Sequence, residues 1–305
     1  MNFLKGLERF GEKRARQLTR LLAPLITLQH RSHLRRNLEQ FFGQGEWSAE
    51  RRKAFTRAHY DYLARLFAEQ AYLGLLPREQ ARARMSASGL NHVEDALRLG
   101  RGVLVVSGHL GNYRFIPPTI GYEGHPVTAV VRAAPFRGNE NFFAKRAGRF
   151  NVRAVFTYQN AVETCRDALR KNEIVYIAFD AVSFDSTSVR LPFGRSQIDL
   201  SRGPALLACR HRLPVIYASA LQQPDGITAI NLVPAESRML ADMESASPEE
   251  LTARWLQRLE ADVSGQPDQW WEWSFQTLGV PATARARAIA FKKPQVSALD
   301  VETTR

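Results

Sequence analysis

Cysteine is scarce in this 305-residue chain, and its two cysteines form no recognisable pattern. Cys165 and Cys209 lie far apart, with no Cys-x-x-Cys pair and no Cys/His cluster around either of them. This argues against a structural zinc site and a disulfide scaffold, and it fits a reducing compartment. Both residues fall among apolar residues of expected helices, so we assign them to the core and not to nucleophilic catalysis.

Long apolar runs are also missing. The longest mainly apolar run, Leu21 to Leu28, has eight residues and contains Pro24. A membrane-spanning helix needs about 20 apolar residues, and no small-residue cleavage site follows this run as it would in a secretory signal. The sequence therefore predicts neither a spanning helix nor a secretory signal.

Acidic residues are scarce near the N-terminus. Residues 1–60 hold 13 Lys and Arg against five Glu and no Asp, which gives +8 of the total net charge of +12. Such an excess attracts either nucleic acid or anionic lipid headgroups. No nucleic-acid recognition module is evident, whereas apolar residues recur at helical spacing through residues 1–28 with Lys and Arg between them. We therefore expect residues 1–30 to form a basic amphipathic helix on an anionic membrane surface; the alternative is a helix packed on the domain with a solvated basic face.

The pattern of the chain changes near Gly89. Residues 46–76 have apolar residues at helical spacing, and Pro77 to Met85 indicates another short helix. Beyond Gly89, short β-branched runs alternate with helix-like segments, which is typical of a mainly parallel sheet with helices on both faces. The expected strands are Val103–Ser107, Val127–Arg132, Ile174–Phe179, Pro214–Ser219 and Ile227–Val233, and the expected helices are 160–171, 203–211 and 248–263. We predict one α/β domain over residues 31–280 with an N-terminal helical layer, followed by a poorly ordered basic tail at 281–305.

His109 is the candidate catalytic residue. It follows the buried run Val103–Ser107 in a turn that contains Gly108 and Gly111, at the sheet edge where ligands bind in open α/β folds. A histidine without metal-spaced partners exchanges a proton near neutral pH. His109 would then act as a general base for a hydroxyl or amine that attacks an activated acyl carbon. We expect Gly108 and Gly111 to let the backbone approach a substrate, and amides at the start of the following helix to face a developing oxyanion.

Further motifs follow His109 in a definite order. They are His109-Leu-Gly-Asn112-Tyr-Arg114, Arg132, Asn139, Arg146, Asp180, Leu191-Pro-Phe-Gly-Arg195, Gly203-Pro-Ala-Leu-Leu-Ala208 and Pro267-Asp-Gln-Trp-Trp271. With Arg35-Arg36-Asn37-Leu38 near the start, they resemble the lipid A late acyltransferases, a branch of the lysophospholipid acyltransferase superfamily, over residues 30 to 278. The His-x-Gly-Asn-aromatic run is the most specific of these motifs.

The resemblance implies a bacterial enzyme that lies peripherally on the cytoplasmic face of the inner membrane, held by its N-terminal helix. Its reaction moves a fatty acyl group from an acyl carrier protein or coenzyme A thioester to a hydroxyl of a glycolipid. The resemblance also implies that no cofactor or metal takes part and that no covalent acyl-enzyme forms.

Position 114 departs from the pattern of the family that the chain resembles. There the catalytic histidine is followed five positions on by Asp or Glu, which orients the imidazole, but here that position is Arg114. A guanidinium cannot accept the ring N–H and disfavours a charged imidazole. Three alternatives remain: another carboxylate replaces the missing one; His109 acts unassisted while Arg114 binds phosphate or carboxylate on the acceptor; or the chain has lost the reaction and only binds lipid or a partner. The candidate carboxylates are Glu123, Asp180 and Asp185.

We select His109 and Asp180 as catalytic residues. Arg114, Arg132, Arg195 and Asn112 are the expected substrate-binding residues, since arginine pairs with phosphate through a fork of two N–H groups. The tryptophans at 270, 271 and 273 belong either to the core or to a membrane-interface belt. The acceptor and the acyl chain length do not follow from the sequence.

Overall fold

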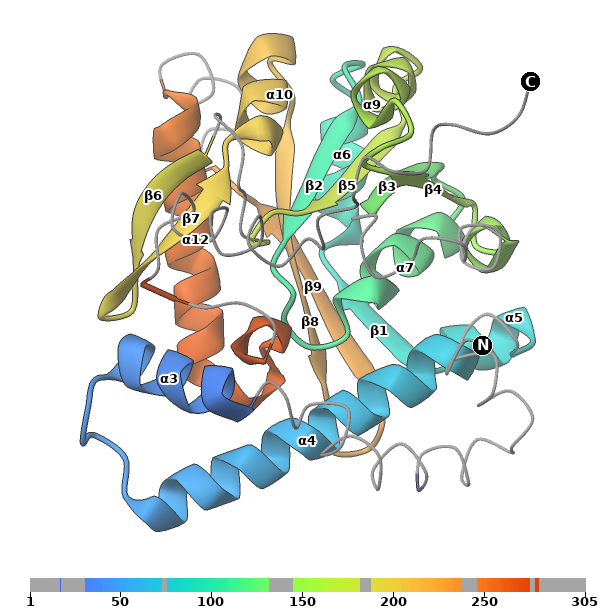
Figure 1. Cartoon of the computed structure of the whole chain (residues 1–305). Coiled ribbons are helices and arrows are strands. Elements are labelled where there is room, and N and C mark those ends of the chain that lie inside the picture. Colours follow the sequence, from blue (N-terminus) through green and yellow to red (C-terminus); the bar gives the residue numbers. More distant parts are fainter. Residues whose placement is uncertain are drawn as a thin grey trace, which may run out of the picture.

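The computed structural model describes residues 31–72, 76–131, 145–181, 188–236, 246–274 and 278–279, together with Gln17 (Figure 1). Its centre is a seven-stranded sheet in which β8 and β9 are antiparallel and all other neighbours run parallel. The predicted mainly parallel α/β fold is therefore confirmed. In spatial order the strands are β1 (Met85–Ser88), β9 (Thr228–Pro234), β8 (Val215–Gln222), β2 (Val103–Ser107), β5 (Ile174–Ala178), β3 (Val127–Val131) and β4 (Val152–Phe156).

The strand β2 lies in the middle of the sheet, between β5 and β8, and all five of its residues are buried. Successive side chains of a strand point to opposite faces. Leu104 and Val106 thus pack into the core on one face, whereas Val103 and Val105 pack into the core on the other. Burial on both faces explains why the sequence of β2 is a continuous aliphatic run. It also fixes the point at which the chain leaves the sheet, after Ser107.

Helices cover both faces of the sheet, as predicted (Figure 1). The apolar sides of α9 (Ala161–Arg170), α10 (Gly203–His211) and α12 (Pro248–Gly265) belong to the same core as Leu104, and those of α6 (Leu90–Leu97) and α7 (Ile116–Tyr122) to the core that contains Val105. The start of α12 is fixed by a capping box, in which Ser247 and Glu250 each accept a hydrogen bond from the other's backbone N–H. These three expected helices of residues 160–263 begin within one residue of the predicted positions.

The predicted N-terminal helical layer consists of α3 (Arg31–Phe42) and the long α4 (Ala49–Tyr72). Figure 1 shows α4 crossing below the sheet, near the lower ends of β8 and β9. Contacts confirm this placement, because Arg65 of α4 donates to the carbonyl of Gln223, directly after β8. None of the described helices is both long and apolar enough to cross a membrane.

Several elements differ from the prediction. Only Arg78–Arg82 of the expected helix at 77–85 is helical, as α5, and Met85 already begins the edge strand β1. The strand β4 and the antiparallel hairpin of β6 (Ser188–Phe193) and β7 (Ser196–Ser201) were not predicted. The strand β6 is only partly buried, and polar residues interrupt its apolar sequence. The predicted membrane-surface helix at 1–30, apart from Gln17, and the basic tail at 281–305 lie outside the described residues.

Candidate active site

His109 lies two residues beyond β2, in a turn that is pressed against the neighbouring strand β8. The Asn112 amide donates to the carbonyl of Ala220 in β8, with an N–O distance of 2.7 Å. Gly111, which directly precedes Asn112, has φ +57°, and a Cβ at this position would lie 1.8 Å from the Ala220 oxygen. Only glycine fits a left-handed residue this close to another backbone. The glycine therefore allows the close approach of the turn to β8, and its expected role in the approach of a substrate stays a prediction.

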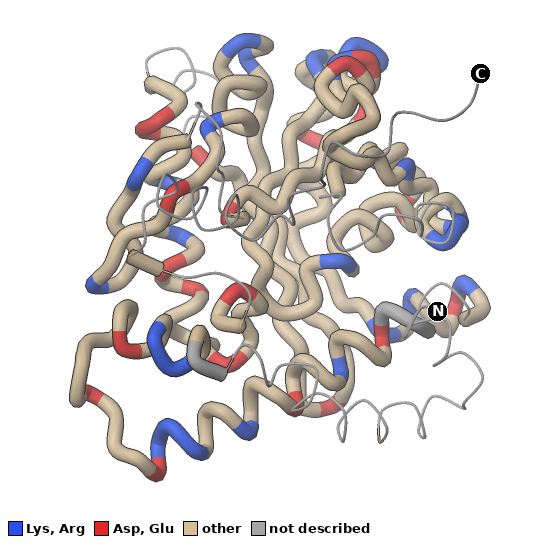
Figure 2. Tube along the Cα trace, viewed as in Figure 1, with Lys and Arg blue, Asp and Glu red and all other residues tan. Residues whose placement is uncertain are grey.

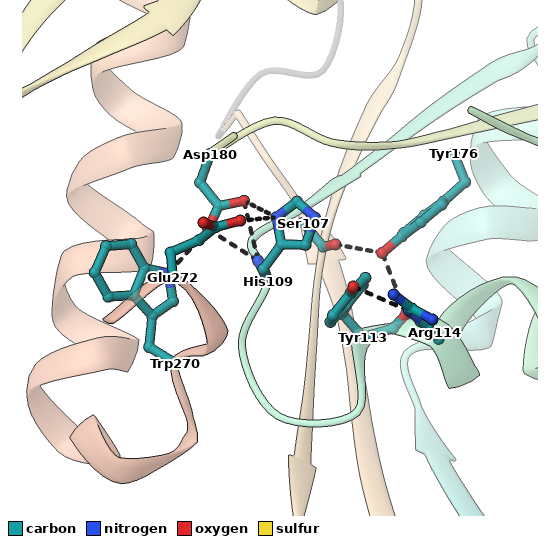
Figure 3. Close-up of polar contacts among 8 residues, drawn as sticks. All are labelled: Ser107, His109, Tyr113, Arg114, Tyr176, Asp180, Trp270 and Glu272. Atoms are coloured by element: carbon teal, nitrogen blue, oxygen red, sulfur yellow. Dashed lines mark hydrogen bonds and ion pairs between the residues drawn. The ribbon is translucent and has the colours of Figure 1, made fainter. Parts of the chain in front are cut away.

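The imidazole of His109 is paired with Asp180, which follows β5. Nδ1 of His109 lies 2.5 Å from Oδ1 of Asp180, and the His109 backbone amide contacts both carboxylate oxygens, at 3.0 and 2.9 Å (Figure 3). Because an ionised carboxylate only accepts hydrogen bonds, this contact assigns the proton to Nδ1. Nε2 is then the ring nitrogen that can accept a proton.

Asp180 is fully buried, with an exposed fraction of 0%. Its Oδ2 accepts a hydrogen bond of 2.9 Å from Nε1 of Trp270. Burial by itself raises the pKa of a carboxyl group, but the positive charge of His109 and the hydrogen bonds from His109 and Trp270 outweigh it, so that the pKa of Asp180 lies below its usual value of 3.8. Asp180 is therefore a buried carboxylate that stays ionised because of His109 and Trp270.

The tryptophan segment Pro267–Trp273 forms the third part of the site, as the 3₁₀ turns η3 (Pro267–Gln269) and η4 (Trp271–Trp273). The amide of Trp271 donates to the carbonyl of His109 at 2.9 Å, and the amide of Gly111 donates to Gln269 at 2.8 Å. Trp270 and Trp273 are fully buried. Of our two expectations for this cluster, core packing is thus observed for these two residues.

Glu272 is a site residue that the sequence analysis missed. Its Oε1 lies 3.6 Å from Nδ1 of His109, and its side chain is only 8% exposed. Glu272 could not be found from local spacing, because it lies 163 positions after His109 in the chain. The only signal was its place between Trp271 and Trp273, a cluster that we assigned either to the core or to a membrane-interface belt.

Tyr113 and Arg114 lie on the opposite side of the imidazole (Figure 3). They begin the 3₁₀ turn η2 (Tyr113–Phe115), and the ring of Tyr113 meets the imidazole edge to face, with centroids 4.5 Å apart. Nε of Arg114 donates to the Tyr113 hydroxyl at 3.0 Å, and its guanidinium carbon lies 5.4 Å from the Tyr113 ring centroid. The imidazole is thus placed between two carboxylates and a guanidinium that is held on Tyr113.

A stripe of α4 side chains holds the His109 turn from below. The hydroxyl of Tyr62 donates to the Gly111 carbonyl at 3.0 Å, and the buried carboxylate of Glu69 accepts from Nδ2 of Asn112 at 2.5 Å and from Nε2 of Gln222 at 3.3 Å. The Asn112 side chain is fully buried. In this structure Asn112 therefore contacts Glu69 and supports the turn.

The structure does not bring every candidate residue to His109. Arg195 lies at the turn of the β6–β7 hairpin beside α3, is 65% exposed and pairs with Glu46 at 3.0 Å, next to an open cavity of about 500 Å³. Glu123 ends α7 and pairs with Arg82. Arg132 and Asp185 lie outside the described residues. Among the candidates that the structure describes, Asp180, Asn112 and Arg114 share the site with His109.

The backbone amides near His109 are largely used within the protein. Those of His109, Gly111 and Asn112 donate to Asp180, Gln269 and Ala220 respectively. These three amides are therefore engaged within the protein, and the expectation that amides at the start of the following helix face an oxyanion stays a prediction.

Comparison with known protein families identifies a family that covers most of the chain. The family described as bacterial lipid A biosynthesis acyltransferases matches residues 1–275 of the chain. A search among curated proteins found no match.

Proposed function

Because the chain belongs to the bacterial lipid A biosynthesis acyltransferase family, we propose that it transfers a fatty acyl group from a thioester to a hydroxyl of a glycolipid or lipid A-like acceptor. The family supports acyl transfer of the lipid A type. The donor, either acyl carrier protein or coenzyme A, and the acceptor are our proposal. The observation that carries the mechanism is the contact of 2.5 Å between His109 and the buried Asp180.

His109 acts as the general base in this mechanism. Its Nε2 takes the proton of the acceptor hydroxyl while the hydroxyl oxygen attacks the thioester carbonyl carbon. The new C–O bond forms, the C–S bond breaks, and the departing thiolate receives the proton from the imidazolium. The products are an ester and a free thiol, and His109 returns to its starting state. No covalent acyl-enzyme and no cofactor takes part in this sequence.

Asp180 replaces the carboxylate that position 114 lacks. It fixes the imidazole tautomer through Nδ1 and offsets the positive charge that forms on the ring during attack. Its position after β5 places it beside His109, because β5 and β2 are parallel neighbours whose ends meet at the same sheet edge. This favours a replaced partner over an unassisted histidine or a chain that has lost the reaction.

Positive groups bind the substrates in this proposal. Arg114 binds an anionic group of the acceptor, and Arg132 and Arg195 are proposed for the phosphates of donor or acceptor. Figure 2 shows Lys and Arg along α3 and the first turns of α4, where Arg36, Arg51 and Lys53 are exposed. We propose that this layer and residues 1–30 hold the protein to the anionic cytoplasmic face of the bacterial inner membrane.

The test is acyl transfer by the purified full-length protein. The wild type, His109→Gln and Asp180→Asn are incubated with an acyl thioester of either carrier and a lipid A-type glycolipid, and the acylated product is measured by mass spectrometry. We expect both variants to lose activity by about a hundredfold or more. His125→Gln is the control, since His125 lies in the loop before β3. Wild-type turnover by His109→Gln would contradict the mechanism, and lipid binding without transfer by the wild type would support the alternative of a silent family member.

A further inference from the structure

Two carboxylates lie beside the same ring nitrogen of His109. Oδ1 of Asp180 is 2.5 Å from Nδ1, and Oε1 of Glu272 is 3.6 Å from it, with both side chains nearly or fully buried. Figure 3 shows the two carboxyl groups on the same side of the imidazole. Asp180 alone is sufficient to accept the single Nδ1 proton. The role of the second carboxylate is therefore not that of a further acceptor for this proton.

Charge gives Glu272 a role at this position. Two buried like charges beside each other are costly unless a positive charge lies between or beside them. The protonated imidazole of His109 is such a charge, and it is the state that forms when His109 accepts a proton. On the other side of the ring, the guanidinium of Arg114 is held on Tyr113 and opposes that state. The negative charge of Asp180 favours the protonated imidazole, and the positive charge of Arg114 opposes it. Glu272 adds a second negative charge that favours the protonated imidazole.

We propose that Glu272 is a positioning residue for His109, a second buried carboxylate that stabilises the protonated imidazole against the charge of Arg114. The proposal rests on the proposed function in that it assigns His109 as the base. It predicts that the His109 imidazole accepts a proton more readily than Asp180 alone would allow. The tryptophan segment positions Glu272 beside His109, because the amide of the preceding residue, Trp271, donates a hydrogen bond to the His109 carbonyl.

Other titratable and charged groups also lie near the imidazole. The experiment must separate their effects on the pKa of His109 from that of Glu272. Tyr62, Tyr113 and Tyr176 are buried, and burial raises the pKa of each hydroxyl above the usual value, so these three stay neutral near pH 7. Within the described part of the chain, the charged groups that remain in the site are Asp180 and Glu272 on one side and Arg114 on the other.

The test is the titration of His109 in the full-length protein, followed by NMR of histidine ring carbons labelled with ¹³C. The His109 signal is assigned as the one that is lost in His109→Gln. In Glu272→Gln we expect the pKa of His109 to fall by about 1 unit. In Glu272→Asp, which keeps the negative charge, we expect the pKa of His109 to stay close to the wild-type value. The control is Glu236→Gln, which removes another buried carboxylate, one that pairs with Arg254 at 2.8 Å.

A second measurement leaves Glu272 in place and therefore does not depend on the folding of its variants. In wild-type protein with ¹³C-labelled glutamate carboxyl groups, the Glu272 signal is expected to shift as His109 titrates, and this shift disappears in His109→Gln. A His109 pKa in folded Glu272→Gln equal to that of the wild type, or a Glu272 carboxyl signal that ignores the His109 titration, overturns the proposal. Neither readout requires a substrate, so failure of the proposed acyl transfer is recognised separately.

Where the protein transfers acyl groups, the pH profile gives a third readout. A general base works in its neutral form, so activity rises with pH through the pKa of His109. Glu272→Gln is expected to move this rise to lower pH by about 1 unit and to lower the plateau about tenfold, since 1 unit of pKa corresponds to a factor of ten. A residue that only supports the fold would lower the plateau without moving the rise.

Discussion

The indole Nε1 of Trp270 donates a hydrogen bond of 2.9 Å to Oδ2 of Asp180, and thereby connects the tryptophan segment to the end of β5. The two residues are 90 positions apart in the chain, and both are fully buried. Oδ1 of the same carboxylate is used by the imidazole of His109. Trp270, together with the His109 backbone amide, therefore donates to the carboxylate oxygen that the imidazole does not use, and a buried ionised carboxyl group requires such donors.

Replacing Trp270 with Phe should weaken the pair of His109 and Asp180. The variant keeps an aromatic ring against Phe193 but removes the indole N–H. A hydrogen bond to a charged group contributes about 1.5–3 kcal/mol, so we expect this loss in the free energy of unfolding at pH 7, together with reduced acyl transfer. Urea unfolding and product formation measure the two effects.

The control for this variant is Trp273→Phe. Trp273 lies in the same segment, but its indole N–H donates to the backbone carbonyl of Pro267 and not to Asp180. Because the folded-state pKa of Asp180 is depressed, its stabilisation is present above the usual value of 3.8 and is lost as the pH falls through the folded-state pKa. As the pH falls, this loss of stability should begin at a higher pH in Trp270→Phe than in the wild type. In Trp273→Phe it should begin at the same pH as in the wild type. Loss of stability at the same pH in the two variants would contradict the role of Trp270.

The central strands could be predicted because burial within the sheet leaves short, mainly apolar runs, and in β2 a glycine directly after Ser107 marks the end of the run. Thus β2 was predicted with both of its observed ends, and β3 and β5 to within one residue. The hairpin of β6 and β7 could not be predicted in the same way, because most of β6 is only partly buried and its sequence contains no continuous aliphatic run. The edge strand β1 has four residues, which is too short for a period to be recognised.

The site was predicted in part, since His109 and Asp180 each follow a buried strand and the parallel sheet brings these strand ends together. Glu272 and the supporting residues Tyr62 and Glu69 come from a loop and a long helix, where no local pattern marks the residues that will contact another segment. Their contacts depend on how α4 and the tryptophan segment pack under the sheet. That packing is a tertiary property of the chain.

Gly111→Ala should destabilise the protein and displace the His109 turn. A Cβ at this position would lie 1.8 Å from the carbonyl oxygen of Ala220, in addition to the strain of a left-handed alanine. We expect a loss of at least about 2 kcal/mol in the free energy of unfolding. Gly45→Ala is the matched control, because Gly45 also has positive φ but nothing within 4 Å of the added Cβ. Urea unfolding of the two variants should give a clearly larger loss at position 111.

Arg114→Gln should change how the acceptor binds without abolishing catalysis. The variant removes a guanidinium near the imidazole, and in our proposal it removes a contact to an anionic group of the acceptor. We expect the KM for a phosphorylated acceptor to rise about tenfold, the scale of one charge-assisted hydrogen bond. The KM for the same acceptor without phosphate should stay unchanged. A similar rise for both acceptors would mean that Arg114 acts on the turn and not on the acceptor.

His59 should make the stability of the protein fall as the pH decreases from 6.5 to about 4. Its Nδ1 lies 2.8 Å from the carbonyl oxygen of Asp268 and its Nε2 lies 3.0 Å from the hydroxyl of Ser274, so that α4 holds both ends of the tryptophan segment through this ring. Burial lowers the pKa of His59 to about 4, although the hydrogen bond to Asp268 opposes this shift.

The sign of this effect follows from proton uptake by the unfolded chain. Between pH 6.5 and 4 the unfolded His59 is protonated while the folded one stays neutral, so unfolding takes up a proton and stability is lost with falling pH, by up to about 3 kcal/mol. His59→Gln removes the titrating group and should flatten this part of the pH profile, although it is less stable at pH 7. Urea unfolding at intervals between pH 7 and 4 measures both curves, and the difference between them isolates His59 from the other histidines. Parallel curves would show that the ring is already protonated when folded, in which case the carbonyl of Asp268 would be bound by a charged donor.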